Sequence, residues 1–399
     1  MTGTPWPTVP LGQVLQLRRP DVTVDPTGTY PFAGVYCFGR GVFRGQERQG
    51  SEFAYRTLTQ LREGDFVYPK LMAWEGAFGV VPAECGGCFV SPEFPAFQVQ
   101  TDRLASPFLG YYFRLPAVWE MMAGGSIGTN VRRRRLHPYD LLRNSMPLPP
   151  LPEQRRIVAK LDQLSAKVEE ARAIQRRSVV ETEILRRSVL ATAFANLSPV
   201  GTLGDVLTDR PRNGWSVRCD NAETGTPVLS LSAVTGFHYD GKAFKRTSAT
   251  TNPAAHYWLT ASDLLITRSN TPELVGHAAI YTGTPAPCIY PDLMMRIPLD
   301  TCVADVLFAW LWLQTHTVRE FIRHRAKGTS ASMKKISQGT VMRIPFPTNV
   351  PLPAQRQVVA RLQPLRDALA PLSVGQARSA AAIDALMPSI LARAFMGEL

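Results

Sequence analysis

A short sequence that occurs twice constrains this chain more than any other feature. Residues 150–161 read Pro-Leu-Pro-Glu-Gln-Arg-Arg-Ile-Val-Ala-Lys-Leu, and residues 351–362 read Pro-Leu-Pro-Ala-Gln-Arg-Gln-Val-Val-Ala-Arg-Leu. The same offset of 201 residues pairs Phe194 with Phe395. Roughly forty residues therefore align without a gap, which makes chance an unsatisfactory explanation. The chain must fold in a way that uses one unit twice.

The similarity continues upstream in shorter pieces. Three pairs of segments match: Leu11–Leu15 with Leu203–Leu207, Gly64–Lys70 with Ser262–Arg268, and Phe108–Met122 with Phe308–Ile322. Their offset drifts between 192 and 201 residues, as loops of different length would cause. We therefore predict a module, a helix, a second module and a second helix, over residues 1–149, 150–198, 199–350 and 351–399.

The two modules have the punctuation of short strands. Apolar runs such as Asp65–Tyr68 and Asp263–Ile266 are bounded by turn residues, which favours strands. Each module also has an apolar segment of helical length, at Ser106–Met122 and Thr301–Arg325. The predicted fold class is α+β, with two tandem modules of mixed α/β structure separated by two long antiparallel helices and related by a pseudo-two-fold repeat.

The segments between and after the modules predict long helices. In residues 152–197, Ile157, Leu161, Leu164 and Val168 recur with the spacing of a heptad seam. At 1.5 Å per residue, such a helix would be roughly 60–70 Å long. The apolar seam could pack only inside the chain, or it could also contact a partner protein. We favour the dual role, because polar and basic faces of the helices remain for a partner.

The second helical segment repeats the seam but contains interruptions. Apolar residues recur at Val358, Leu362 and Leu365, whereas prolines occur at 364, 371 and 388 and a glycine at 375. Proline removes a helical hydrogen bond and kinks a helix. We therefore expect a bent or broken helix around residues 371–376.

The charge balance favours an anionic partner. The chain has 44 Lys and Arg against 32 Asp and Glu, a net charge of +12. Such an excess attracts polyanions, most commonly nucleic acid, although a merely soluble basic protein has the same balance. Six cysteines are too few for a disulfide framework, and the longest apolar stretch, Val306–Leu313, is too short to span a bilayer. A cytoplasmic protein with no membrane association follows.

Basic turns recur at matching places in the two modules and are candidate DNA contacts. Glycines let backbone amides approach phosphate, and the cations neutralise it, although any single basic run is usually just solvated. Lys70 and Arg268 share a position after a strand. The candidate DNA-binding residues are Lys70, Thr129, Asn130, Arg132, Arg133, Arg134 and Arg135 in the first module and Arg268, Lys327, Thr329, Ser330, Lys334 and Lys335 in the second.

Motifs for catalysis or metal binding are incomplete. The pair Cys85 and Cys88 has the spacing of half a zinc site but lacks a second pair. Asn252-Pro253 lacks the following residues of an amino-methyltransferase motif, and Gly241-Lys242 is not a phosphate loop. Pro291-Asp292 is not followed by the acidic-x-Lys sequence of a nuclease. We predict no catalytic residues, no metal site and no cofactor in this chain.

The duplicated motif and the ending Ala394–Leu399 resemble the specificity subunit of type I restriction-modification systems. The resemblance covers the whole layout. It implies two target-recognition domains, two helical spacers, and binding to double-stranded DNA, to two methyltransferase subunits and, where the system has them, to restriction subunits. S-adenosylmethionine and ATP are expected on those partners only. The implied helix and partner contacts are Gln154, Ile157, Leu161, Leu164, Gln355, Val358, Leu362 and Leu365; no base-reading residue can be transferred.

Three alternatives remain open from the sequence. The chain could be the DNA-recognition subunit of another phage-defence complex that does not methylate. It could be an enzyme with degenerate motifs, or a helical scaffold that does not bind DNA. The duplicated basic turns argue against the scaffold, and the incomplete motifs argue against the enzyme.

Overall fold

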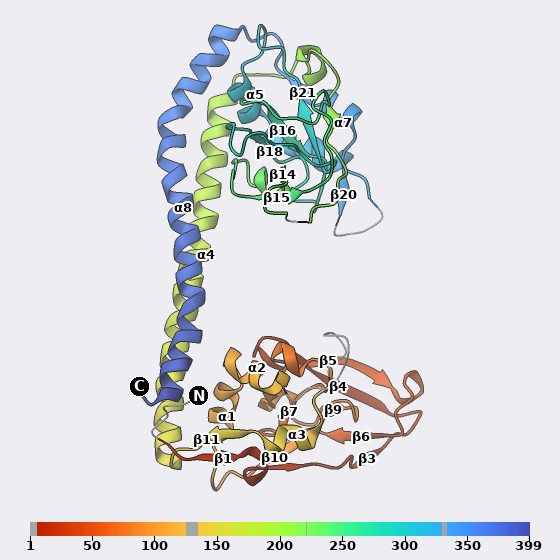
Figure 1. The fold of residues 1–399 in the computed structure, drawn as a ribbon, viewed down its shortest axis with the longest axis vertical. Helices are drawn as coiled ribbons and strands as arrows, with labels where there is room; N and C mark the ends of the chain where they lie inside the picture. The colour runs from red at the N-terminus through yellow and green to blue at the C-terminus, as the bar shows by residue number, and fades with distance from the viewer. Residues whose placement is uncertain (1–5, 125–134, 221, 329–332) are drawn as a thin grey trace. The chain divides into compact units, whose positions relative to one another are not determined.

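The computed structural model describes residues 6–124, 135–220, 222–328 and 333–399. The chain forms two compact units, and both long helices, α4 (Leu151–Phe194) and α8 (Leu352–Met396), contribute to each of them (Figure 1). Unit 1 consists of Met1–Arg176 with Gln376–Leu399, and unit 2 consists of Arg177–Gly375. The boundaries between the units therefore fall inside the two helices rather than at their ends.

Unit 1 contains two sheets and a short pair of strands. Its strands are β1 (Thr8–Pro10), β2 (Leu15–Leu17), β3 (Val22–Thr23), β4 (Thr29–Tyr36), β5 (Gly41–Gln49), β6 (Thr57–Gln60), β7 (Phe66–Val67), β8 (Gly79–Val80), β9 (Phe89–Val90), β10 (Ala96–Val99) and β11 (Ser145–Pro147). One sheet has the order β2-β10-β7-β8 and the other β3-β6-β9-β4-β5, while β1 pairs with β11. All pairs are antiparallel except β4 with β9.

Unit 2 repeats part of this arrangement. Its strands are β12 (Gly201–Thr202), β13 (Arg212–Asn213), β14 (Thr226–Leu229), β15 (Phe244–Thr247), β16 (Leu264–Thr267), β17 (Ser269–Asn270), β18 (Ala278–Ile280), β19 (Met294–Ile297), β20 (Lys334–Lys335) and β21 (Pro345–Phe346). The order β13-β19-β16-β18 corresponds to β2-β10-β7-β8 in unit 1, and β12 pairs with β21 as β1 does with β11. The strands predicted around residues 65–68 and 263–266 are thus confirmed, as β7 and β16.

Each module helix predicted as one segment is divided in two. In unit 1, α1 (Ser106–Tyr112) and α2 (Pro116–Gly124) replace the expected single helix, because Pro116 cannot donate a helical hydrogen bond. In unit 2, α5 (Val306–Trp312) and α6 (His316–Arg325) do the same. The remaining short helices are α3 (Pro138–Arg143) and α7 (Gln338–Met342). The mixed α+β class with two long helices is confirmed.

The core of unit 1 joins residues from both ends of the chain. Phe395, near the end of α8, contacts Phe108 and Tyr112 of α1 with ring centroids 5.0 and 5.4 Å away. Ile157 and Leu161 of α4 belong to the same buried cluster. Burying such side chains contributes about 1.5–3 kcal/mol each. The C-terminal end of α8 is therefore an integral part of unit 1.

Within unit 1 the two long helices run antiparallel. The Arg172 guanidinium lies 3.2 Å from the Asp384 carboxylate, and Gln175 Nε2 donates to the Gln376 carbonyl at 3.4 Å. Residue numbers therefore increase along α4 as those of their partners on α8 decrease, which is the antiparallel pairing that the duplicated sequence predicted.

The expected break in the second helix is wrong. The helix α8 is continuous over 45 residues and passes through Pro371 and Gly375 without interruption. A proline forfeits one backbone hydrogen bond, but burial of Leu362 in unit 2 and of Phe395 in unit 1 holds the helix on both sides of it.

Among the described residues, α8 is a helix that is long and apolar enough to cross a membrane by length and composition alone. Its buried residues Leu362, Leu391 and Phe395 lie in the cores of the two units.

Candidate nucleic-acid interface

Lys70 follows strand β7 and is held by two main-chain hydrogen bonds. Its amide donates to the Glu93 carbonyl at 3.0 Å, and its carbonyl accepts from the Leu136 amide at 2.9 Å. The Glu93 carboxylate lies 3.9 Å from Lys70 Nζ and 3.1 Å from the Arg135 guanidinium. Two cations therefore share one carboxylate, which leaves a local excess of one positive charge.

Arg268 occupies the same backbone position in unit 2. Its amide donates to the Leu293 carbonyl at 2.8 Å, and its carbonyl accepts from the Ile336 amide at 2.9 Å. The guanidinium donates to the Asp292 carbonyl at 3.3 Å. The sequence pairing of Lys70 with Arg268 thus corresponds to one backbone arrangement, formed once in each unit.

Three lysines surround the strand that follows Arg268. Lys327 and Lys335 exchange two backbone hydrogen bonds, of 2.9 and 2.7 Å, and Lys335 also pairs with Ser269 across β17 and β20. Lys334 Nζ donates to the Gly328 carbonyl at 3.0 Å. The structure therefore brings Lys327, Lys334 and Lys335 together beside Arg268, as the repeat suggested.

Several of the predicted contacts cannot be placed. Thr129, Asn130, Arg132, Arg133, Arg134, Thr329 and Ser330 lie outside the described residues. Their role in DNA binding stays a prediction.

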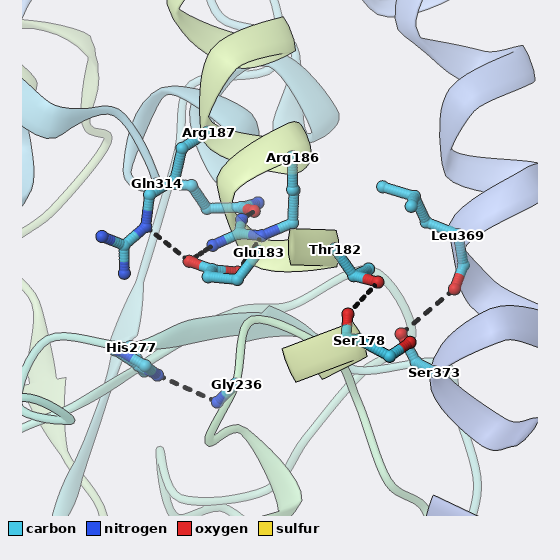
Figure 2. Close-up of polar contacts among 10 residues, drawn as sticks. All are labelled: Ser178, Thr182, Glu183, Arg186, Arg187, Gly236, His277, Gln314, Leu369 and Ser373. Carbon is cyan, nitrogen blue, oxygen red and sulfur yellow. Dashed lines mark hydrogen bonds and ion pairs between the residues drawn. The ribbon is translucent and has the colours of Figure 1, made fainter. Parts of the chain in front are cut away.

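A further polar cluster, which the sequence analysis did not predict, lies where α4 enters unit 2 (Figure 2). The Glu183 carboxylate accepts from Arg186 at 2.8 Å and from Arg187 at 2.6 Å. Arg186 also donates to the Gln314 side chain, which follows α5. The bond from Arg186 to Gln314 connects the helix α4 to the module of unit 2.

His277 lies in the same region and is half-buried. The Gly236 amide donates to His277 Nδ1 at 2.9 Å (Figure 2), and the ring lies 4.2 Å from that of Phe237. Burial, together with the nearby Arg319 and Arg186 guanidinium groups, lowers the pKa of His277 to about 3. The imidazole is therefore neutral at physiological pH and accepts through Nδ1.

Gln154, predicted to serve the helices and partners, is fully buried in unit 1. Its Oε1 accepts from the Ala105 amide at 2.8 Å, and its Nε2 donates to the carbonyls of Arg103 and Pro149, both at 2.8 Å. The side chain fastens the start of α4 to the segment before α1.

Gln355 does the same in unit 2. Its Oε1 accepts from the Asp305 amide at 2.9 Å, and its Nε2 donates to the carbonyls of Val303 and Val350, both at 2.9 Å. The motif shared by residues 150–161 and 351–362 therefore encodes a docking contact between helix and module within the chain.

This burial shows that five of the predicted helix and partner contacts serve helix docking within the chain. The side chains of Gln154, Ile157, Leu161, Gln355 and Leu362 are buried within their own units and cannot contact a partner in this structure. Leu164, Val358 and Leu365 are half-buried, so their role at a partner interface stays a prediction. The exposed large apolar residues of the two helices are others: Ile174, Val179, Val180, Ile184 and Leu185 on α4, and Leu372, Val374, Leu386 and Met396 on α8.

Within the described part of the chain, no group of three or more His, Cys, Asp or Glu side chains is arranged to hold a metal ion. Cys85 and Cys88 are buried thiols.

Comparison with known proteins points in one direction. The chain is 26% identical over 316 residues to the specificity subunit of the type I restriction enzyme EcoKI of Escherichia coli K12, a match that covers 74% of this chain. It is 23% identical over 347 residues to the StySPI specificity subunit of Salmonella potsdam, covering 83% of this chain and 72% of that subunit. The resemblance to type I specificity subunits is confirmed. No protein-family model matches the chain.

The matches differ in how much of each known protein they cover. The matched segment spans 66% of the length of the EcoKI subunit, slightly less than two thirds. A chain from a structural study of the assembly of a type I R-M system matches over 100% of both chains, with a TM-score of 0.68 and 22% identity. That structural match shows that this chain shares the fold of that chain.

Proposed function

We propose that this chain is the DNA-recognition subunit of a type I restriction-modification complex and has no catalytic role of its own. The observation that carries the proposal is the duplicated basic site, in which Lys70 and Arg268 occupy the same backbone position in the two units. Each is joined by further cations, Arg135 in unit 1 and Lys335 in unit 2. Two such sites on modules of different sequence suit a bipartite, asymmetric target.

The basic sites would position the chain on the phosphate backbone. Phosphate contacts set affinity and orientation, whereas contacts to base edges set specificity. The lysines and arginines described above supply the first kind of contact. Residues elsewhere on the same modules must supply the second, and these are expected to differ between the units.

The partners would be two methyltransferase subunits and, where the system has them, restriction subunits. The exposed apolar residues of α4, such as Val180 and Ile184, and of α8, such as Val374, are the surface that we assign to them. Adenine must leave the base stack before it is methylated. Both steps would be carried out by the partners, which would also bind S-adenosylmethionine and ATP. The complex would act in the cytoplasm.

Adenine methylation across the host genome tests the proposal. We would compare cells that express the neighbouring methyltransferase gene alone with cells that also express this chain. The expected result is a split motif with a fixed gap that is methylated only when the chain is present. Absence of chain-dependent methylation, despite a stable complex, would contradict it.

The alternative is a defence complex that recognises DNA without methylating it. The duplicated basic sites are equally compatible with it. In that case the chain would still select a split DNA sequence, but its neighbouring genes would leave that sequence unmethylated.

A further inference from the structure

Phe38 has an unusual backbone conformation at the tip of the β4–β5 hairpin. Its φ angle is +62°, a left-handed value that bulky side chains rarely adopt. Its ring is nevertheless 62% exposed, so burial of the side chain does not account for the conformation. Strained residues cluster at functional sites, which makes an exposed aromatic residue with a strained backbone a candidate for a functional role.

The tip is fixed rather than free. The Phe38 amide donates to the Glu75 carbonyl at 2.8 Å, and the Gly39 amide donates to the Gly76 carbonyl at 2.9 Å. The Phe38 ring lies 6.4 Å from that of Trp119 on α2. Gly39 is required there, because a Cβ atom would lie 2.9 Å from the Arg114 Cα atom. The fold thus presents the Phe38 ring to solvent in one orientation.

Other aromatic and basic groups continue this surface along the hairpin. The rings of Tyr36 and Phe43 are stacked with centroids 4.1 Å apart, and the Arg40 guanidinium lies over Tyr36 at 5.0 Å. Phe43 sits on Gly34, where a Cβ atom would approach it to 2.4 Å. Tyr36 and Arg40 are both exposed. An aromatic surface beside a guanidinium is suited to nucleic acid, whose bases are apolar and whose backbone is anionic.

The hairpin tip lies close to the basic site of unit 1. Its anchor, Glu75, is only five residues along the chain from Lys70. Even a fully extended segment of that length spans at most roughly 18 Å, and the turn that joins Met72 to Glu75 shortens it. DNA bound at Lys70 would therefore reach the hairpin tip within a few base pairs.

We propose that Phe38 makes an apolar contact to a base of the duplex DNA that unit 1 binds, and that Arg40 contacts an adjacent phosphate. The proposal rests on the proposed function and names a specificity-determining residue for it. Phe contacts DNA through a thymine methyl group or by wedging against a base step, and either contact distinguishes sequences.

A comparison with unit 2 indicates that the proposed contact is particular to unit 1. Phe237 also has a left-handed backbone, with a φ angle of +60°. Its ring, however, is 6% exposed and is covered by His277 and by the guanidinium groups of Arg186 and Arg319. The backbone conformation is thus shared by the two modules, whereas an exposed ring is presented only by Phe38.

The test uses the full chain purified with the products of its neighbouring genes. Phe38→Gly removes the ring while accepting the left-handed backbone, so the variant is expected to melt at the same temperature as the wild type or higher. Phe38→Tyr keeps a ring, and Tyr55→Ala removes an exposed aromatic residue beyond the other end of the hairpin. Each protein is used to select sequences from a random duplex library, and its affinity is measured against salt concentration.

We expect Phe38→Gly to weaken binding to the selected duplex about tenfold or more and to lose selectivity at one or two adjacent positions in one half of the motif. Because no charge is removed, the salt dependence should not change. Phe38→Tyr and Tyr55→Ala should behave as the wild type. Replacing thymine by deoxyuridine at the affected position separates a methyl contact, which is then lost, from a base-step contact, which persists.

Two results would overturn the proposal while leaving the proposed function intact. In the first, Phe38→Gly selects the same sequences with the same affinity. In the second, it loses only the co-purifying protein subunits, so that the ring is a protein contact. If the wild-type complex selects no sequence at all, the proposed function fails and this inference fails with it.

Discussion

The buried side chains of Gln154 and Gln355, which lie 201 residues apart, each make the same set of three hydrogen bonds. Each side chain accepts from the amide of the residue that precedes α1 or α5, and donates to two main-chain carbonyls. A buried amide with all of these partners is satisfied only when the helix sits correctly on its module. The duplicated motif is therefore a duplicated helix dock.

Removing either glutamine should destabilise its own unit. Gln154→Ala leaves the Ala105 amide and two carbonyls unsatisfied, which we expect to cost about 2–4 kcal/mol of unfolding free energy in unit 1. Gln355→Ala should have the same effect on unit 2. Hydrogen exchange, read peptide by peptide, distinguishes the two units. Gln363→Ala, at an exposed position on α8, is the matched control and should leave exchange unchanged.

The carboxylate of Glu93 should restrain DNA binding by unit 1. It lies within ion-pair distance of both Lys70 and Arg135. Glu93→Gln keeps the size of the side chain and releases both cations, so affinity for duplex DNA of any sequence should rise several-fold at low salt. Titration of a fluorescent duplex at two salt concentrations measures this. An unchanged affinity would mean that these cations do not face DNA.

Lys70 and Arg268 should make equivalent, non-specific contributions. If each neutralises one phosphate, Lys70→Ala and Arg268→Ala should each lower the slope of log affinity against log salt by about 0.9, and the double variant by about twice that. The preferred sequence should not change. Lys70→Arg, which retains the charge, is the control; a slope that falls in only one of the two alanine variants would refute equivalent roles.

Unit 2 should weaken in acid because of His277. Its pKa in the folded chain is lowered to about 3, below the ordinary value of 6.5, so the unfolded chain binds the proton first as pH falls. The stabilisation is complete above pH 6.5 and is lost between pH 6.5 and 3, by up to about 1.4 kcal/mol per pH unit. Exchange of the Gly236 amide, corrected for intrinsic rates, should therefore accelerate between pH 7.5 and 5.

His277→Asn provides the comparison for this pH dependence. The asparagine Oδ1 can take the place of Nδ1 as acceptor for the Gly236 amide, and it does not titrate. The acid sensitivity of unit 2 should then largely disappear. If it persists undiminished, other groups are responsible for it.

The repeat made part of this site predictable. The pairing of Lys70 with Arg268 follows from the sequence alignment alone, although the residue types differ, because both follow a buried strand in the same order of elements. The repeated glutamine of the helix dock was also visible in the sequence, but its buried contacts with the module were not. Sequence periodicity indicates which face of a helix is buried, and it does not say whether the chain itself or a partner buries that face.

The hairpin tip could not be predicted from sequence. An aromatic residue such as Phe38 is usually interpreted as core, and nothing in the residue types gives the sign of φ at a non-glycine position. The one available signal was the pair Gly39 and Gly41, which indicates a tight turn. Likewise, the polar cluster around Glu183 and His277 depends on hydrogen bonds between residues 41 and 128 positions apart, which no local pattern encodes.

The helix α8 continues through Pro371, although proline usually interrupts a helix. Pro371 is exposed, so replacing it by alanine changes the backbone without disturbing a core. Because α8 is continuous, Pro371→Ala restores a hydrogen bond to the carbonyl four residues earlier and should stabilise the chain by about 1–3 kcal/mol. Amides of residues 367–376 should then exchange more slowly. Pro353→Ala is the matched control, because Pro353 lies in the first turn of α8, where the amide has no helical partner, and it should be nearly neutral. Equal, negligible effects of both substitutions, with amides of residues 372–376 exchanging as in an unstructured chain, would restore the broken helix that the prolines suggested.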